Sequence, residues 1–165
     1  HIAGESLLKG TAAIIDAWER YAIPYHLTVV ANKMDVRAPP FVTVVKRLDD
    51  TELRRLQNAC LFHLQPSEYE GFGHVLHESM SVGAILATTD APPMNEVPGL
   101  HIPPAAHGKH GLAQTAQVNA AGVAAAVESM WGMDDAAVIA ARALARKAYE
   151  AETAAFEAAF REVLK

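Results

Sequence analysis

This sequence has only one cysteine, no long apolar run and no excess of basic residues. Its single cysteine, Cys60, excludes an internal disulfide framework and suits a reducing compartment, so we expect a cytoplasmic chain. No apolar run approaches the roughly 20 residues that span a bilayer, and the opening residues do not resemble a signal peptide. The charged residues comprise 14 Lys and Arg against 19 Asp and Glu, giving a net charge of −5. Neither half of the chain is strongly basic, which argues against nucleic acid as the main partner.

The length and composition fit one folded domain. A chain of 165 residues with 51% hydrophobic and 20% charged residues is long enough and apolar enough to build a core. We find no internal repeat and no linker that would divide it, so we expect a single domain over residues 1–165. Its first residue is His1 rather than Met, which suggests a fragment or a processed chain.

Short β-branched runs alternate with helical stretches, a pattern typical of an α/β domain with a mostly parallel sheet. Strands are predicted at residues 1–3, 26–31, 41–46, 60–64 and 84–88. Helices are predicted at residues 11–21, from an N-cap within 49–51 to residue 58, at 74–81, from 118 to a break near 132–134, and from 135 to about 163. Five prolines between residues 92 and 104 predict loops with at most one short strand, and residues 107–110 are predicted to form a solvated polar loop.

The segment PSEYEGFGHVLHESM, residues 66–80, carries the most informative pattern. It follows a predicted parallel strand, and open α/β sheets bind their ligands at the C-terminal ends of such strands. Gly71 and Gly73 permit unusual backbone angles and a close approach of a ligand to the main chain. Because a helix begins directly afterwards, the free N–H groups near Gly73, His74 and Val75 predict a phosphate site.

Two carboxylates bracket this predicted phosphate site. Glu70 lies in the turn before the helix, and Glu78 lies about 7 Å along the helix from its start, at 1.5 Å per residue. A carboxylate repels phosphate but accepts hydrogen bonds from hydroxyl groups, so the pair indicates a ligand with sugar hydroxyls. The alternative is that Glu70 only favours the helix dipole and Glu78 is a solvated helix residue.

The order of these motifs resembles a known family. Glu70-x7-Glu78 within residues 66–83, followed by ATTDAPPMNEV at 87–97, is similar to the C-terminal domain of family-4 retaining glycosyltransferases (glycosyl transferases group 1) of the GT-B architecture. The opening HIAGESLLKGT, residues 1–11, resembles the start of the same domain. The resemblance covers nearly the whole chain and implies a Rossmann-like parallel sheet flanked by helices, the C-terminal half of a GT-B fold.

The resemblance also implies a role for each matching residue. Glu70 would orient the donor sugar and Lys9 would neutralise the donor diphosphate, so these two are the expected catalytic residues. Glu78 would bind the ribose. The remaining expected nucleotide-sugar contacts are Ser6, Gly71, Phe72, Gly73, His74 and Val75. In this family the sugar moves from a nucleoside diphosphate to a glycan or lipid-linked acceptor with retention of configuration, as in polysaccharide biosynthesis, and generally without a divalent metal.

The family pattern further implies an acceptor-binding domain before this one. We therefore expect the isolated chain to bind a donor weakly and to catalyse little or no transfer. We expect the complete enzyme to associate peripherally with the inner face of the membrane.

Two features of the sequence depart from the family pattern. No arginine precedes Lys9, so either Ser6 and backbone amides compensate or the grip on the donor is altered. Residues 31–40, which would approach the nucleobase, lack the usual glycine pair and helix.

A metal site is not expected, and two other interpretations remain open. His74 and His77 lie three residues apart on one predicted helix, but no third ligand at a suitable spacing indicates a metal site. A nucleotide-sugar epimerase or a sugar phosphorylase half would share the architecture. A binding module without catalysis would also share it, and the missing arginine before Lys9 makes this reading credible. Fold alone does not separate these functions, so the site must decide.

Overall fold

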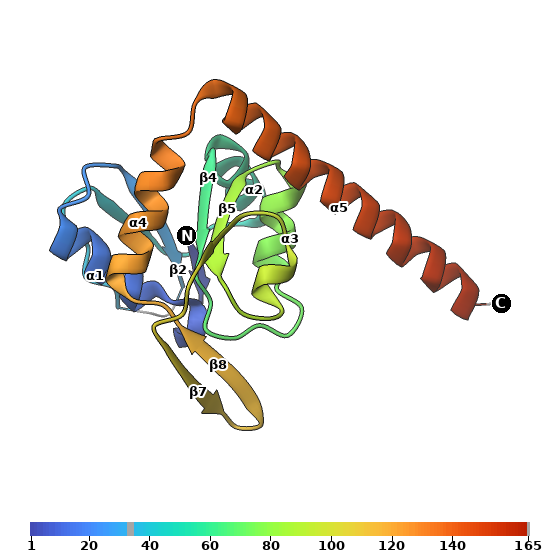
Figure 1. Cartoon of the computed structure of the whole chain (residues 1–165), viewed down its shortest axis with the longest axis horizontal. Helices are drawn as coiled ribbons and strands as arrows, with labels where there is room; N and C mark the ends of the chain where they lie inside the picture. Colours follow the sequence, from blue (N-terminus) through green and yellow to red (C-terminus); the bar gives the residue numbers. More distant parts are fainter. Residues whose placement is uncertain (33–34, 165) are drawn as a thin grey trace.

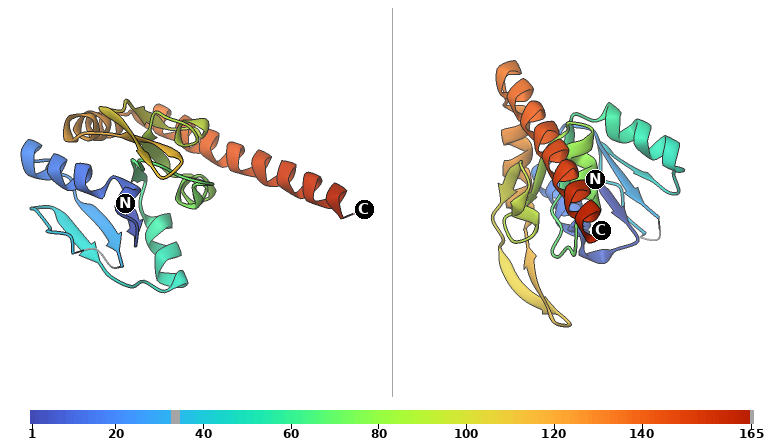
Figure 2. Two further views of the ribbon diagram at one scale, coloured as in Figure 1. Left: turned by 90° about the horizontal axis from the view of Figure 1, so that it is seen from below. Right: turned by 90° about the vertical axis from the view of Figure 1, so that its right-hand side faces the viewer.

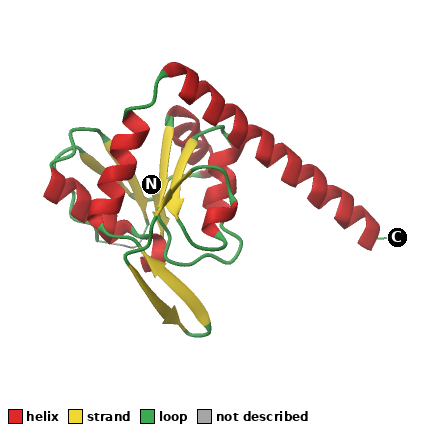
Figure 3. Ribbon diagram, viewed as in Figure 1, coloured by secondary structure: helices red, strands yellow, loops and turns green. Residues whose placement is uncertain are grey.

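Strands and helices alternate along the chain as the sequence predicts (Figures 1 and 3). The structure is a computed structural model and describes residues 1–32 and 35–164. The strands are β1 (Ile2–Gly4), β2 (Leu27–Ala31), β3 (Val42–Val45), β4 (Phe62–Gln65), β5 (Ile85–Thr89), β6 (Leu100–Ile102), β7 (Ala106–His110) and β8 (Ala113–Gln117). The helices are α1 (Thr11–Tyr21), α2 (Asp50–Ala59), α3 (His74–Ser81), α4 (Ala120–Trp131) and α5 (Asp135–Val163), with short 3₁₀ helices η1 (Leu7–Lys9) and η2 (Met94–Glu96).

The parallel strands form two three-stranded sheets, in the orders β1-β2-β3 and β4-β5-β6. Between β1 and β4, side chains make the connection in place of a backbone ladder. His1 Nδ1 lies 2.8 Å from the carbonyl oxygen of Leu64, and the Ile2 amide donates to Gln65 Oε1 at 3.4 Å. The predicted α/β class with Rossmann-like parallel strands flanked by helices is confirmed, and the parallel strands are divided into two sheets between β1 and β4.

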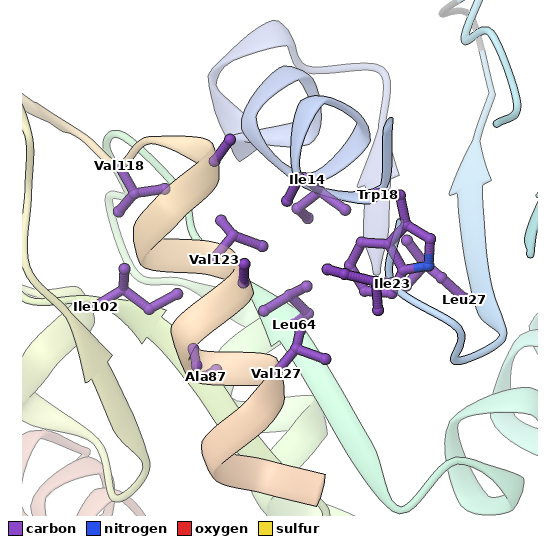
Figure 4. Packing of buried hydrophobic residues seen from close by; sticks show 14 of the residues in the cluster. Ile14, Trp18, Ile23, Leu27, Leu64, Ala87, Ile102, Val118, Val123 and Val127 are labelled. Carbon is purple, nitrogen blue, oxygen red and sulfur yellow. The ribbon is translucent and has the colours of Figure 1, made fainter. Parts of the chain in front are cut away.

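Helices cover both faces of the second sheet, and β5 shows the two layers directly. Ile85 and Ala87 point into the larger hydrophobic cluster, which includes residues of α1 and α4. Leu86, between them in the chain, points the other way into a smaller cluster with residues of α3 and α5. Figure 4 shows Val123 and Val127 of α4 facing the strands in the larger cluster, and Figure 2 shows α1 and α3 on opposite sides of the strands. This layering leaves the ends of the strands open to ligands.

The helix boundaries agree closely with the sequence prediction where local capping fixes them. The predicted bounds of α1, α3 and α5 are confirmed. Helix α2 begins with a capping box, in which the Asp49 side chain accepts from the Glu52 amide and the Glu52 side chain accepts from the Asp49 amide. Strand β4 begins at Phe62, two residues later than predicted, because the Cys60 amide still donates to the Leu56 carbonyl at the end of α2.

The prediction of a loop at residues 107–110 was wrong. These residues belong to β7, which pairs antiparallel with β8 in a hairpin that projects from the body of the molecule (Figure 1). Every residue of β7 is exposed, so the predicted solvation is confirmed. The two-residue connection is Gly111-Leu112, and Gly111 has φ of +61°. Glycine at the first position of a two-residue loop is a hairpin signal, and it was available in the sequence.

Helix α5 leaves the body of the molecule along its length (Figure 1). Ala145 is its single fully buried residue, and the residues from 150 to 163 are exposed. Phe156 and Phe160 stack on each other with ring centroids 5.9 Å apart. Within residues 1–32 and 35–164, no helix combines the length and the apolar character needed to cross a bilayer.

Candidate functional site

Lys9 and Glu70 are the two expected catalytic residues. They lie 61 residues apart in the sequence and are in direct contact in the structure. Lys9 Nζ lies 2.5 Å from Glu70 Oε1, and the Ser67 hydroxyl donates to the same oxygen at 2.6 Å. The two charged side chains are 18% and 9% exposed, so solvent screens their attraction only in part. The structure thus holds the lysine charge against the first carboxylate of the Glu-x7-Glu motif.

The loop that carries Lys9 is built for a close approach to the loop that carries Glu70. Ser6 caps η1 by accepting from the Leu8 amide, and the Leu8 carbonyl accepts from the Glu68 amide at 2.8 Å. Gly10 follows with φ of +70°, and a Cβ atom there would lie 2.1 Å from the Pro66 carbonyl oxygen. Only glycine allows the two loops this separation. The sequence reading placed Lys9 near the site but did not identify Gly10 or Ser67.

The predicted anion site lies at the start of α3. Gly73 is the N-cap, with φ of +77°, and no side chain caps the helix there. The Leu76 amide donates to the Gly73 carbonyl at 2.9 Å, which leaves the first amides of the helix, at His74 and Val75, without intrahelical acceptors. Of the two glycines in the turn, Gly73 adopts the left-handed conformation and Gly71 does not. The amides are arranged as an anion cradle requires.

Glu78 is oriented by a different partner from Glu70. Its Oε2 accepts from Gln57 Nε2 at 2.7 Å, and Gln57 is buried at the C-terminal end of α2. The main-chain carbonyl oxygen of Gln57 lies 3.1 Å from His63 Nε2. The other ring nitrogen of His63, Nδ1, lies 2.8 Å from the Ser79 hydroxyl. Burial lowers the pKa of His63 to about 4. This neutral, buried histidine positions Gln57, which the sequence reading did not connect with Glu78.

A cavity of about 750 Å³ opens between α3, η2 and the outer half of α5. Four of the predicted site residues line it: Gly71, Phe72, His74 and Glu78. Its lining does not include Lys9 or Glu70, so the structure divides the predicted site residues between this cavity and the adjoining Lys9–Glu70 pair. Gly73 is the N-cap of α3 and Val75 is the second residue of the helix.

The cavity also contains side chains that the sequence reading did not assign to a site. His77 stacks on Phe72 with ring centroids 4.3 Å apart, and its Nε2 lies 3.1 Å from Glu152 Oε2 on α5. Tyr149 and Phe156 complete the α5 wall. Their contribution depends on where α5 runs relative to α3, which no local pattern indicates.

Two further sequence predictions bear on ligands. Among the described residues, no group of three or more His, Cys, Asp or Glu side chains could hold a metal ion. The segment predicted to approach the nucleobase, residues 31–40, includes Lys33 and Met34, which lie outside the described residues.

Comparison with solved structures shows the same fold in several glycosyltransferases. The structure of Anabaena Alr3699/HepE, in complex with UDP and glucose, matches with a TM-score of 0.72 and 16% identity, over 99% of this chain and 47% of that one. Sucrose-phosphate synthase from Thermosynechococcus elongatus matches with a TM-score of 0.71 and 21% identity, over 96% of this chain and 43% of that one. The chain therefore spans less than half the length of these two proteins.

A third match is the C-terminal domain of LpcC, a glycosyl transferase group 1 family protein from Francisella tularensis. It has a TM-score of 0.62 and 16% identity, over 88% of this chain and 80% of that one. These likenesses support the expected fold, one Rossmann-like half of a GT-B glycosyltransferase. No curated protein matches the sequence.

A sequence-family comparison is more specific than the fold. The model of the family described as glycosyl transferases group 1 matches residues 36–146, which is most of the chain and includes both Glu70 and Glu78. The chain belongs to the glycosyl transferases group 1 family.

Proposed function

We propose that this chain is the donor-binding C-terminal domain of a retaining family-4 glycosyltransferase. The complete enzyme would transfer a sugar from a nucleoside diphosphate to a glycan or lipid-linked acceptor. The single observation that carries the proposal is the contact between Lys9 and Glu70 beside the uncapped start of α3. These groups lie beyond the C-terminal end of β4. The cation and the free amides suit the diphosphate, and the carboxylate suits the sugar hydroxyls.

The diphosphate would take Lys9 away from Glu70. In this structure the lysine charge is balanced by the Glu70 carboxylate at 2.5 Å. A diphosphate on the His74 and Val75 amides would offer Lys9 a more highly charged partner and release Glu70 for the hydroxyls of the donor sugar. Lys9 would then stabilise the negative charge that grows on the diphosphate as the glycosidic bond breaks. Ser67, which also donates to Glu70, would hold the carboxylate in place during this exchange.

Glu78 would bind the ribose. Gln57 donates to one carboxylate oxygen of Glu78 and fixes its orientation, so the carboxylate is prepared to accept from ribose hydroxyls. Phe72, Gly71 and Ser6 would complete the contacts with the nucleotide sugar. The UDP and glucose present in the Anabaena structure support a ligand of this class for the fold.

Three further parts of the proposal concern the complete enzyme. An acceptor-binding domain would precede residues 1–165, and without it this chain would catalyse little transfer. No divalent metal would be needed, because Lys9 and the start of α3 would balance the diphosphate. The enzyme would act in the cytoplasm, at the inner face of the membrane.

Nucleotide binding by the chain tests the proposal. Isothermal titration calorimetry with UDP, GDP and ADP should detect binding of at least one, and Lys9→Ala should weaken that binding at least tenfold. Lys109→Ala, which removes a lysine from the exposed hairpin strand β7, is the charge-matched control and should leave the affinity unchanged. If no nucleoside diphosphate binds, or if the two lysine variants behave alike, the proposed function is wrong.

A second variant tests the ribose contact. Glu78→Ala should weaken the same nucleotide by roughly 1–3 kcal/mol, the cost of losing hydrogen bonds to a charged group. Glu157→Ala on the exposed part of α5 serves as its control. Unchanged affinity in Glu78→Ala would remove this carboxylate from the nucleotide site.

A further inference from the structure

Gln57 is a buried polar residue at the place where α2 meets α3. It is 6% exposed, lies near the C-terminal end of α2, and its Nε2 donates to Glu78 Oε2 at 2.7 Å. A buried amide needs a hydrogen-bond partner, and the Glu78 carboxylate supplies one. Within residues 1–32 and 35–164, Glu78 Oε1 has no hydrogen-bond partner. Gln57 therefore occupies one oxygen of the carboxylate and leaves the other to a ligand.

The main chain of Gln57 is tied to α3 by a second route. Its carbonyl oxygen lies 3.1 Å from His63 Nε2, and His63 Nδ1 lies 2.8 Å from the hydroxyl of Ser79, the residue that follows Glu78. His63 and Ser79 are both buried. Because the side chain and the main chain of Gln57 are each held against α3, its amide has little freedom to follow the Glu78 carboxylate if that group turns. Gln57 therefore restrains the orientation of the carboxylate.

The restraint decides how Glu78 presents its remaining acceptor positions. A carboxylate has about four such positions on its two oxygens, and Gln57 uses one of them. The 2′- and 3′-hydroxyls of ribose are neighbours on one side of the ring, so both can donate to one carboxylate, as the paired N–H groups of arginine do. A carboxylate held at one angle loses a hydrogen bond when either hydroxyl is missing. One that turns freely readjusts to the hydroxyl that remains.

We propose that Gln57 is a positioning residue that makes Glu78 select nucleotides with an intact ribose diol over their 2′-deoxy and 3′-deoxy forms. The inference rests on the proposed function, in which Glu78 binds the ribose. Gln57 does not line the cavity beside α3, so it acts through Glu78 rather than on the nucleotide. Glu78 is half-buried, so water can replace a missing hydroxyl in part. The expected selectivity is therefore roughly tenfold to a hundredfold, which corresponds to one hydrogen bond to a charged group.

Deoxynucleotides test the selectivity of the unmodified chain. The probes are whichever of UDP, GDP and ADP binds most tightly, together with the 2′-deoxy and 3′-deoxy forms of that nucleotide, in isothermal titration calorimetry. Both deoxy forms should bind roughly ten to a hundred times more weakly than the ribonucleotide. This comparison needs no substitution, so it tests the inference even if a variant fails to fold.

Substitutions of Gln57 test whether this residue sets the selectivity. Gln57→Met keeps the length of the side chain but removes the donor. The ribonucleotide should lose affinity while the deoxy forms change little, so the selectivity should fall below about threefold. Gln57→Glu places a second carboxylate against Glu78 and should lower the selectivity in the same way. In Glu78→Ala the selectivity should be absent, and adding Gln57→Met to that variant should not change it further.

Asn58→Leu is the matched control for Gln57→Met. Asn58 is the next residue of α2 and also carries an amide, but it is exposed, and its Nδ2 donates to the Arg54 carbonyl within the same helix. Both substitutions exchange an amide for an apolar side chain of similar size. Thermal melts should show that each variant is folded, and Asn58→Leu should keep the selectivity of the unmodified chain. A role of Gln57 in stability alone would weaken all three nucleotides by one factor and leave their ratio unchanged.

Failure of this inference can be distinguished from failure of the proposed function. If the unmodified chain binds the ribo and deoxy forms equally, or if Gln57→Met keeps their ratio, the inference is wrong while nucleotide binding that depends on Lys9 still supports the proposed function. If Gln57→Met binds the ribonucleotide more tightly, Gln57 competes with the ribose and the inference is again wrong. If no nucleoside diphosphate binds, both the inference and the proposed function fail.

Discussion

Gly10→Ala should be one of the most damaging single-methyl additions near the proposed donor site. Gly10 has φ of +70°, a conformation that costs an L-residue about 1–2 kcal/mol. The added Cβ would also lie 2.1 Å from the Pro66 carbonyl oxygen, whereas ordinary contacts begin at 3.4 Å, so one loop must move by the difference of 1.3 Å. Overpacking of this kind costs a further 1–3 kcal/mol. We expect a total loss of about 2–5 kcal/mol in the free energy of unfolding.

Gly4→Ala separates the two contributions. Gly4 has φ of +58°, but a Cβ atom there would have nothing within 4 Å. Its substitution should therefore cost only the conformational part, about 1–2 kcal/mol. Urea denaturation of both variants measures the difference. The Gly10 variant should also lose nucleoside diphosphate affinity, because the loop that moves carries Lys9. Equal losses of stability for the two variants would refute the argument that the loops approach too closely for a side chain.

The remaining predictions concern stability. His63 has a pKa of about 4 in the folded chain against 6.5 when unfolded, so the unfolded chain binds more protons between these values. Folding stability should be complete above about pH 6.5 and fall by about 3 kcal/mol as the pH drops to 4; His63→Gln should flatten this part of the profile in urea titrations, and an unchanged slope would contradict it. Asp49→Ala should cost about 1 kcal/mol by removing the α2 cap, whereas Asp50→Ala, one residue later, should cost less. Arg142→Ala should lower the melting temperature, because Arg142 Nε donates to the Gly83 carbonyl and ties α5 to the end of α3; Lys147→Ala, exposed on the same helix, is its control.

Local signals explain why much of the fold could be predicted from the sequence. Helix α3 starts where Gly73 takes a left-handed conformation, and α5 starts where the Asp134 side chain accepts from the Ala137 amide. Both signals depend on residues within one turn, so a sequence reading finds them. Strand β2 was found in the same way, from its β-branched residues. The hairpin was missed because Ala, Gln, Gly and His carry little strand preference, and the Gly111 turn signal was overlooked.

The candidate site was predictable in its parts but not in its assembly. The turn and helix pattern predicted Glu70 and Glu78 as site residues, and the family resemblance added Lys9. Their partners Ser67 and Gln57 act through contacts that depend on how loops and helices pack, and the α5 wall of the cavity depends on the path of a helix more than 50 residues away in sequence. Tertiary packing of this kind leaves no periodic signal in the chain.

The attachment of α5 has a mechanical consequence for the cavity. Tyr149 packs against the smaller hydrophobic cluster, and Glu152 Oε2 lies 3.1 Å from His77 Nε2. Phe156 follows Glu152 by four residues, or about 6 Å of helix. A tilt of about 5° beyond Glu152 would therefore displace Phe156 by only about 0.5 Å. The position of Phe156 is therefore set by the contacts of Tyr149 and Glu152, and loss of either contact would move the α5 wall of the cavity.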